Sequence, residues 1–294
     1  MGFIDFMDKG FESAVKTALG MGKERLSHKD VARLDSILIF ASADKYLQVP
    51  WQSESGAFNI HKPGLCFNVL SSENGLWQSD LRHFNRLKAL YLYAETTDLS
   101  FLSNFSKLTE LHVVDSRHKD WSFLGELLNL RCLFVQNASL QDLRVLGELA
   151  IKQEEIAARS SDPFLWSHKL EFVRLIHCGI QDMSPLAELK WLAELDLSHN
   201  EISDFSSVLD LPLYSLTFRY NRLSDLSLIA RDRWHLDYLD VRHNQITDIS
   251  PLVHFVNLSK LCVGHNPITD YSVLNQLPVQ RHDVDSYNPR RKRG

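Results

Sequence analysis

Residues 236–257 read LDYLDVRHNQITDISPLVHFVN, and this stretch decides the expected fold. Leu236, Leu239 and Val241 alternate with polar residues, which is the pattern of a short strand with one buried face. The pattern starts again at Leu258, directly after the quoted stretch. A segment this short cannot bury its apolar side alone and needs neighbours of the same kind. The stretch therefore predicts a solenoid built from stacked coils.

The same pattern recurs along the chain at a spacing of about 22 residues. Its copies begin at Leu87, Leu108, Leu130, Leu170, Leu192, Leu213, Leu236 and Leu258. One insertion, at residues 147–169, breaks the spacing. Its first half is rich in helix-forming residues, and a Ser-Ser-Asp-Pro sequence then predicts the end of a helix. We therefore expect a solenoid over residues 87–275 with an inserted helical segment.

We expect the segments before and after the regular repeats to form caps that cover the two ends of the solenoid. Within residues 1–30, apolar side chains recur at helical spacing from Phe3 to about residue 20, which predicts a helix that covers the first coil. We expect residues 31–86 to form the first coils of the solenoid in degenerate form, with a loop insertion, because prolines and glycines interrupt the strand-like spacing. We expect residues 276–294 to form a C-terminal cap followed by a basic tail.

Two polar positions recur in register after the predicted strands. The first carries an amide that can satisfy backbone groups where they leave the sheet; its members are Asn200, Asn221, Asn244 and Asn266. The second is an Asp-apolar-Ser motif, whose aspartates are Asp98, Asp120, Asp182, Asp204, Asp225, Asp248 and Asp270, with Asp142 in a variant form. A row of carboxylates also suggests metal binding or acid–base chemistry. An aspartate that caps a short helical turn in every coil explains the motif better.

A column of histidines follows the strands as well. It contains His177, His199, His243 and His265 and is interrupted by Tyr220. Neighbouring strands lie about 4.8 Å apart, so adjacent imidazoles are within reach of a shared metal ion. No cysteine or carboxylate clearly completes such a site in the sequence. We therefore expect these residues to be part of the scaffold, and we expect no metal and no cofactor.

Composition and motifs exclude several classes of function. The formal net charge of −5 gives no general case for a nucleic-acid partner, although the tail ends in four basic residues. The four cysteines are far apart, which indicates a reducing compartment without disulfides. The sequence has no signal peptide and no membrane-spanning run, so we expect a cytoplasmic protein. The G-x-S-x-G, H-E-x-x-H and P-loop motifs are absent, so we expect no enzyme activity.

The repeats resemble a known family. LAELDLSHNEISDFSSV, LDYLDVRHNQITDISPL and LSKLCVGHNPITDYSVL are similar to the leucine-rich repeats of SDS22-like proteins and of bacterial internalins. This resemblance implies an α/β solenoid, with a curved parallel β-sheet on the concave face and short 3₁₀ turns on the convex face. It also implies a non-catalytic scaffold that binds a protein partner on the concave surface. A regulatory subunit of a protein phosphatase is the alternative that the SDS22-like resemblance implies.

The strand residues between the inward-facing leucines point to the predicted concave face. This face changes from aromatic to charged along the chain, and aromatic and arginine side chains are typical of binding hot spots. The residues predicted to contact a partner are Tyr91, Tyr93, His112, Phe134, Arg174, Asp196, Arg219, Tyr220, Tyr238, Asp240 and Arg242. Two alternatives stay open. The N-terminal loop or the insertion covers the aromatic residues, or the charged residues neutralise one another across neighbouring strands.

Overall fold

The computed structural model describes residues 2–41, 65–68, 76–159, 169–227, 236–278 and 281–283. The chain forms two compact units. Unit 1 comprises Met1–Ser139 and Glu148–Lys169, and unit 2 comprises Leu140–Gly147 and Leu170–Gly294. In each unit short parallel strands alternate with turns, most of which are 3₁₀ helices. The prediction of stacked strand-and-turn coils is confirmed.

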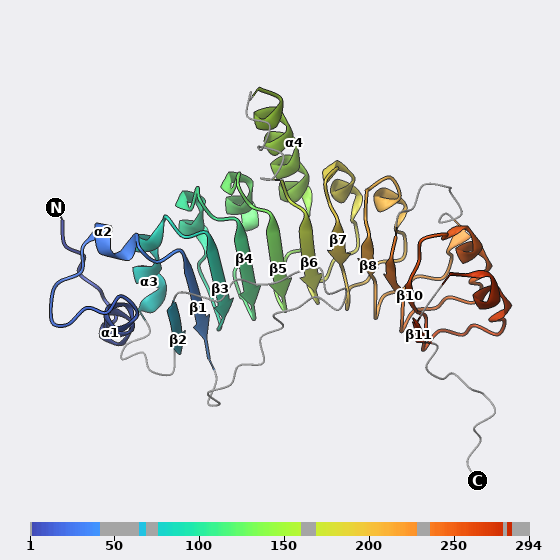
Figure 1. The fold of residues 1–294 in the computed structure, drawn as a ribbon, viewed down its shortest axis with the longest axis horizontal. Coiled ribbons are helices and arrows are strands. Elements are labelled where there is room, and N and C mark those ends of the chain that lie inside the picture. The colour runs from blue at the N-terminus through green and yellow to red at the C-terminus, as the bar shows by residue number, and fades with distance from the viewer. Residues whose placement is uncertain are drawn as a thin grey trace, which may run out of the picture. The chain divides into compact units, whose positions relative to one another are not determined.

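Unit 1 contains five described parallel strands (Figure 1). They are β1 (Ser36–Phe40), β2 (Leu65–Asn68), β3 (Ala89–Tyr93), β4 (Glu110–Val114) and β5 (Cys132–Gln136), and the helical segments between them are α3 (Trp77–Leu81), η2 (Arg82–Phe84), η3 (Ser100–Asn104) and η4 (Trp121–Glu126). Their order is β2-β1-β3-β4-β5, so the second strand of the chain lies outside the first. β1 pairs with β2 on one edge and with β3 on the other, and Ile37, Leu38 and Ile39 are all buried, as in a strand covered on both faces.

Unit 2 keeps its strands in chain order. Its elements are β6 (Phe172–Ile176), η6 (Ser184–Glu188), β7 (Glu194–Asp196), η7 (Ser206–Val208), β8 (Ser215–Thr217), β9 (Tyr238–Asp240), η9 (Ser250–His254), β10 (Lys260–Cys262), η10 (Ser272–Gln276) and β11 (Arg281–Asp283). The register places Leu195, Leu216, Leu239 and Leu261 side by side, and all four are buried. This row of leucines fills the interior of successive coils. η6 packs against η7, and η9 packs against η10.

The predicted amide and aspartate columns both have the expected structural roles. Each of Asn200, Asn221, Asn244 and Asn266 uses its side chain to bond backbone groups of its own coil and of the preceding coil. Each aspartate of the Asp-apolar-Ser motif accepts a hydrogen bond from the backbone N–H two residues later, at 2.7–3.0 Å. Asp142 does the same with Arg144. Capping therefore explains the row of carboxylates.

The N-terminal cap differs in detail from the prediction. Helix α1 (Lys9–Ala18) begins six residues after Phe3, because the Asp8 carboxylate caps it by accepting from the backbone N–H of Phe11. A second short helix, α2 (His28–Val31), follows. The Phe11 ring of α1 is fully buried, with its centroid 4.9 Å from that of Phe67 in β2. The helix thus covers the edge strand of unit 1, as a cap must.

Residues 147–159 of the predicted insertion belong to helix α4 (Arg144–Arg159), which starts slightly earlier than expected. Lys152 donates to the carbonyl oxygen of Gly125, and Gln153 donates to that of Leu130. Gly147, in the first turn of α4, which belongs to unit 2, lies so close to η6 that a Cβ atom would be 2.9 Å from the carbonyl oxygen of Pro185. The Ser-Ser-Asp-Pro stop, most of the predicted loop between residues 40 and 65, and the basic tail lie outside the described residues.

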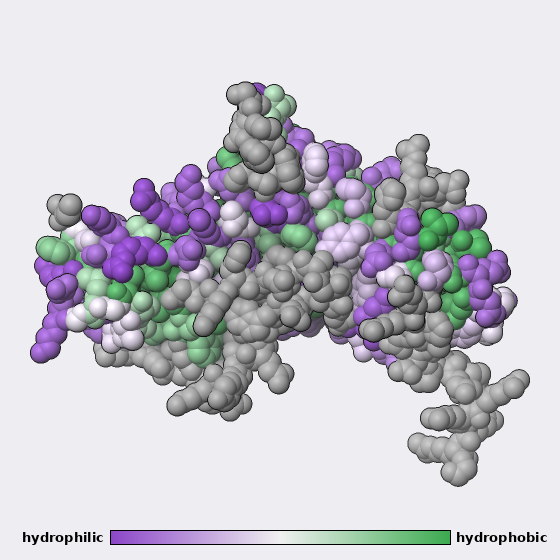
Figure 2. Space-filling model, in the orientation of Figure 1, coloured by the Kyte–Doolittle hydropathy of each residue, from purple (hydrophilic) through white to green (hydrophobic). Residues whose placement is uncertain are grey.

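The surface in the view of Figure 2 is mixed in polarity. Hydrophobic residues gather over the last coils of unit 2, which are drawn in orange and red in Figure 1. Val253 and Val256 of these coils are exposed. None of the described helices is both long enough and apolar enough to cross a membrane.

Candidate functional site

The strand register within each unit confirms which residues share a row. Tyr91, His112 and Phe134 lie side by side on β3, β4 and β5 of unit 1. In unit 2 the equivalent row contains Arg174, Asp196, Thr217, Asp240 and Cys262. We call the side of each sheet that carries these rows the strand face. Regular parallel pairing carries one side chain from each strand into such a row.

The aromatic part of the strand face is not an exposed surface, which corrects the prediction. Tyr91 has an exposed fraction of 0% and Phe134 of 4%, and His112 is buried as well. Tyr93 is partly exposed, and its hydroxyl lies 3.0 Å from Nδ1 of His112. The His112 ring meets Tyr91 and Phe134 edge-on, with centroids 4.9 and 5.2 Å away. The three rings therefore pack edge to face across adjacent strands of unit 1.

The charged residues of unit 2 pair with one another, as one of the two alternatives expected. Arg174 on β6 binds the buried carboxylate of Glu194 on β7, with Nη2 2.5 Å from Oε1. Arg242 forms a two-pronged contact with Asp240, through Nε to Oδ1 at 3.0 Å and Nη2 to Oδ2 at 2.7 Å. Arg219 lies 3.6 Å from the same carboxylate. Neutralisation within the sheet therefore satisfies much of this charge.

Burial removes three more predicted contact residues from the surface. Asp240 is fully buried and accepts a hydrogen bond from the Tyr238 hydroxyl, which is buried too. Asp196 is buried and accepts hydrogen bonds from the backbone N–H and the hydroxyl of Ser198. Loss of hydration raises the pKa of Asp196, although Ser198 and two arginines act in the opposite direction. These buried residues organise the strand face, and a direct contact between them and a partner stays a prediction.

The histidine column marks a position with left-handed backbone. His177, His199, Tyr220, His243 and His265 all have φ between 54° and 59°. Histidine and asparagine tolerate this conformation better than most residues, which accounts for the recurrence without any metal. From His199 to His265 the rings stack face to face through Tyr220 and His243, with centroids 4.2, 3.9 and 4.0 Å apart. We call these four stacked rings the ring ladder.

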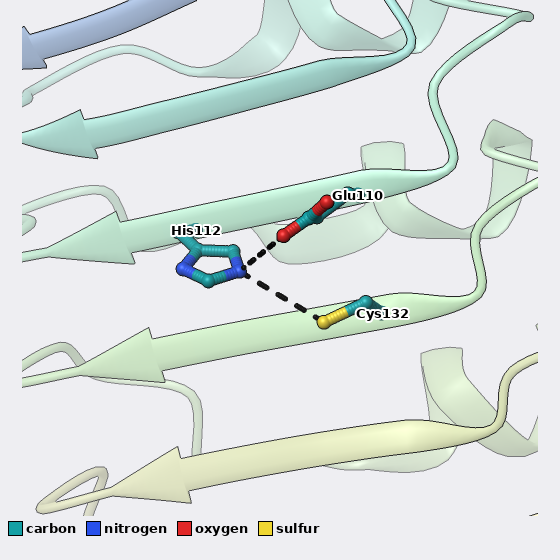
Figure 3. Close-up of side chains that lie close together, drawn as sticks. All are labelled: Glu110, His112 and Cys132. Carbon is teal, nitrogen blue, oxygen red and sulfur yellow. Dashed lines mark hydrogen bonds and ion pairs between the residues drawn. The ribbon is translucent and has the colours of Figure 1, made fainter. Parts of the chain in front are cut away.

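A second cluster lies in unit 1 and was not predicted. Glu110 and His112 are on β4 and Cys132 is on β5, and all three side chains are buried (Figure 3). His112 Nε2 is 3.1 Å from Glu110 Oε1 and 3.8 Å from Cys132 Sγ. Sequence reasoning missed the cluster because Cys132 is twenty residues from His112 and follows no ligand motif. Only the pairing of Glu110 with Cys132 across the strands brings the three groups together.

Comparison with known proteins agrees with this architecture. Residues 234–276 match a family model of two leucine-rich repeats, and residues 188–204 match a model of one such repeat. An internalin (inlF) from Listeria monocytogenes has a similar structure, with a TM-score of 0.62 and 21% identity over 94% of this chain and 83% of that chain. The fold is a leucine-rich-repeat solenoid.

Other leucine-rich-repeat structures share the fold at low sequence identity. A leucine-rich-repeat protein of Leptospira interrogans has a TM-score of 0.53 and 21% identity, covering 69% of this chain and 50% of that one. The ectodomain of the Arabidopsis thaliana receptor kinase GASSHO1/SCHENGEN3, solved with CASPARIAN STRIP INTEGRITY FACTOR 2, has a TM-score of 0.51 and 20% identity, covering 69% of this chain and 25% of that one. No curated protein matches the sequence of this chain.

Proposed function

We propose that this leucine-rich-repeat solenoid is a non-catalytic scaffold that binds a protein partner at the C-terminal ends of the strands of unit 2. The contact residues in this proposal are Tyr220 of the ring ladder and the adjacent Arg219 and Arg242. Leucine-rich-repeat solenoids commonly use the extended surface that their stacked strands create to bind other proteins. The proposal keeps three of the predicted contact residues and assigns a structural role to the buried ones.

The observation that carries the proposal is the exposure of Tyr220. Its side chain is 45% exposed, although it is a large aromatic residue held on a rigid scaffold. Tyr220 is stacked between His199 and His243, so its ring is already ordered before any partner binds. Arg219, the preceding residue, and Arg242, in the next coil, have side chains that are 26% and 23% exposed. Tyrosine and arginine are enriched in binding hot spots, and an ordered ring loses little entropy on binding.

Affinity capture with matched variants tests this surface. Tyr220→Ala is compared with Trp191→Ala, because Trp191 is an aromatic residue with the same exposed fraction of 45% outside the ring ladder. Proteins captured by the wild-type chain are identified by mass spectrometry. We expect Tyr220→Ala to lose a specific partner that Trp191→Ala retains. Equal capture by both variants, with unchanged circular dichroism, would rule out Tyr220 as a contact residue.

The finer assignments of family and location stay predictions. The SDS22-like resemblance rests on the repeat motif, and the phosphatase-regulating role depends on it. Stoichiometric co-purification with a metallophosphatase would support that role, and any other stable partner would favour the more general scaffold. A cytoplasmic location rests on the wide spacing of the cysteines. Microscopy of the tagged full-length chain in its own cells would test it.

A further inference from the structure

We propose that Glu110, His112 and Cys132 form a zinc-binding site in unit 1. Their three side chains come from two adjacent, paired strands, and the ligand atoms Oε1, Nε2 and Sγ all lie within 4.8 Å of one another. Figure 3 shows the three groups directed toward a common point. The site is separate from the proposed partner surface, which lies in unit 2.

The backbone explains how these groups meet. Glu110 and His112 are two residues apart on β4, so both side chains lie on the same face of the sheet. Cys132 is the register partner of Glu110 on β5. Strand residues hold their side chains more rigidly than loop residues do, which favours a preformed site.

The distances agree with metal coordination. Zinc bonds to nitrogen, oxygen and sulfur of about 2.0–2.3 Å place neighbouring ligand atoms of a tetrahedral site about 3.3–3.8 Å apart. Nε2 of His112 lies 3.8 Å from Sγ of Cys132 and 3.1 Å from Oε1 of Glu110. Small side-chain movements are therefore enough to close all three bonds around one ion. Water or another small ligand would take the fourth position of the tetrahedron.

The burial of the Glu110 carboxylate favours a bound cation at this place. The side chain of Glu110 is more than nine-tenths buried, and Oε1 lies 3.1 Å from Nε2 of His112, a contact that is an ion pair only when the imidazole is protonated. When the imidazole is neutral, this contact gives the buried carboxylate no compensating positive charge, and burying the carboxylate is then costly. A divalent cation bound to Oε1 removes this cost directly.

The charge of the three ligands and the chemistry of their donor atoms favour zinc over other divalent metals. With a carboxylate, a neutral imidazole and a thiolate, the site carries two negative charges, which one divalent ion balances in a buried place. The thiol proton of Cys132 leaves to solvent when the metal–sulfur bond forms. Thiolate and imidazole favour zinc over magnesium or calcium, which prefer oxygen ligands alone. The Tyr93 hydroxyl oxygen, 3.0 Å from Nδ1 of His112, can accept a hydrogen bond from Nδ1–H, and this tautomer leaves the lone pair of Nε2 to bind the metal.

Cobalt substitution tests the proposal on the full-length chain. The protein is unfolded with a chelator, refolded, and titrated with Co²⁺, which reports tetrahedral thiolate coordination by a sulfur-to-cobalt charge-transfer band. We expect one Co²⁺ per chain, displacement by Zn²⁺, and no displacement by Mg²⁺. Zinc content of the chain purified without chelator provides a second readout. A correctly folded wild-type chain that shows no charge-transfer band would overturn the proposal.

Two cysteine variants locate the site. Cys132→Ser should lose the charge-transfer band and weaken Co²⁺ binding by more than roughly tenfold. Cys262→Ser is the matched control, because Cys262 is also a buried strand-face cysteine but lies in unit 2. Glu110→Gln should keep the band with weakened binding. A band that survives in Cys132→Ser and disappears in Cys262→Ser would place the metal elsewhere and refute the proposed ligands. Far-UV circular dichroism confirms that each variant is folded.

Discussion

The side-chain Nδ2 of Asn244 donates a hydrogen bond to the carbonyl oxygen of Phe218, 2.8 Å away in the preceding coil. The same Nδ2 donates to the carbonyl oxygen of Val241 in its own coil, and Oδ1 accepts from the backbone N–H of Leu223. One buried amide therefore satisfies three backbone groups where two coils leave the sheet. Asn200, Asn221 and Asn266 repeat this arrangement, so hydrogen bonding joins the coils as regularly as the leucines do.

Asn244→Ala should lower the free energy of unfolding by about 2–4 kcal/mol, because each buried backbone group that loses its partner costs about 1–3 kcal/mol. Urea unfolding measures the change, and hydrogen exchange at the Leu223 amide should become faster. Gln245→Ala is the control, since Gln245 is the next residue and its side chain is exposed. Similar losses in both variants would show that the amide has no special role.

Leu239→Ala should destabilise unit 2 by roughly 2–5 kcal/mol, because the substitution leaves a cavity in the row of inward leucines. Leu239 is fully buried between the strands that carry Leu216 and Leu261. Thermal or urea unfolding measures the loss. Val256→Ala, at a side chain that is 72% exposed, should stay within about 0.5 kcal/mol of the wild type. A small effect of Leu239→Ala would mean that the coil collapses around the cavity.

Arg174→Ala should cost about 2–3 kcal/mol, because it leaves the carboxylate of Glu194 buried without its ionic partner. This is less than the roughly 3–5 kcal/mol typical of a fully buried pair, since the Arg174 guanidinium is partly exposed. The double variant Arg174→Ala/Glu194→Gln should recover part of the loss. A double-mutant cycle in urea measures the coupling, and a coupling energy near zero would contradict the pairing.

The ring ladder should make the stability of unit 2 sensitive to pH. Burial lowers the pKa of His199 and of His243, with further contributions from Arg219 and His265 respectively. In the unfolded chain both groups have the ordinary histidine pKa of 6.5. The folded state therefore disfavours their protonated forms. This contribution to stability is complete above pH 6.5 and is lost as the pH falls from there through the lower folded-state pKa values.

His243→Tyr tests the pH dependence because it keeps a ring at this position and removes the titrating group. Tyr220 already occupies the equivalent left-handed position in the neighbouring coil, so the backbone tolerates tyrosine there. The midpoint of thermal unfolding is measured on both sides of pH 6.5. We expect a smaller decrease on acidification in the variant than in the wild type. An unchanged decrease would assign the acid sensitivity to other groups.

The repeat pattern alone was enough to predict the architecture of this chain. When an apolar strand recurs about every 22 residues, few folds other than stacked coils can bury all of its copies. The amides and aspartates were interpretable as well, because their roles are local: Asp248, for example, caps a turn only two residues away. The insertion was also recognisable as a helix from its composition, although its start at Arg144 depended on the capping Asp142.

Tertiary structure decided everything that depends on which side chains meet across strands. The sequence showed that Tyr91 and Phe134 share a face, but their burial follows from packing against His112 and other neighbours in space. The position of β2 outside β1 depends on which strand edges pair, because β1 pairs with β3 on one edge and with β2 on the other. Glu110, His112 and Cys132 form a cluster only because parallel pairing aligns residues that lie about one repeat apart in the chain. Repeat spacing determines the coils, whereas contacts between coils determine the chemistry of their faces.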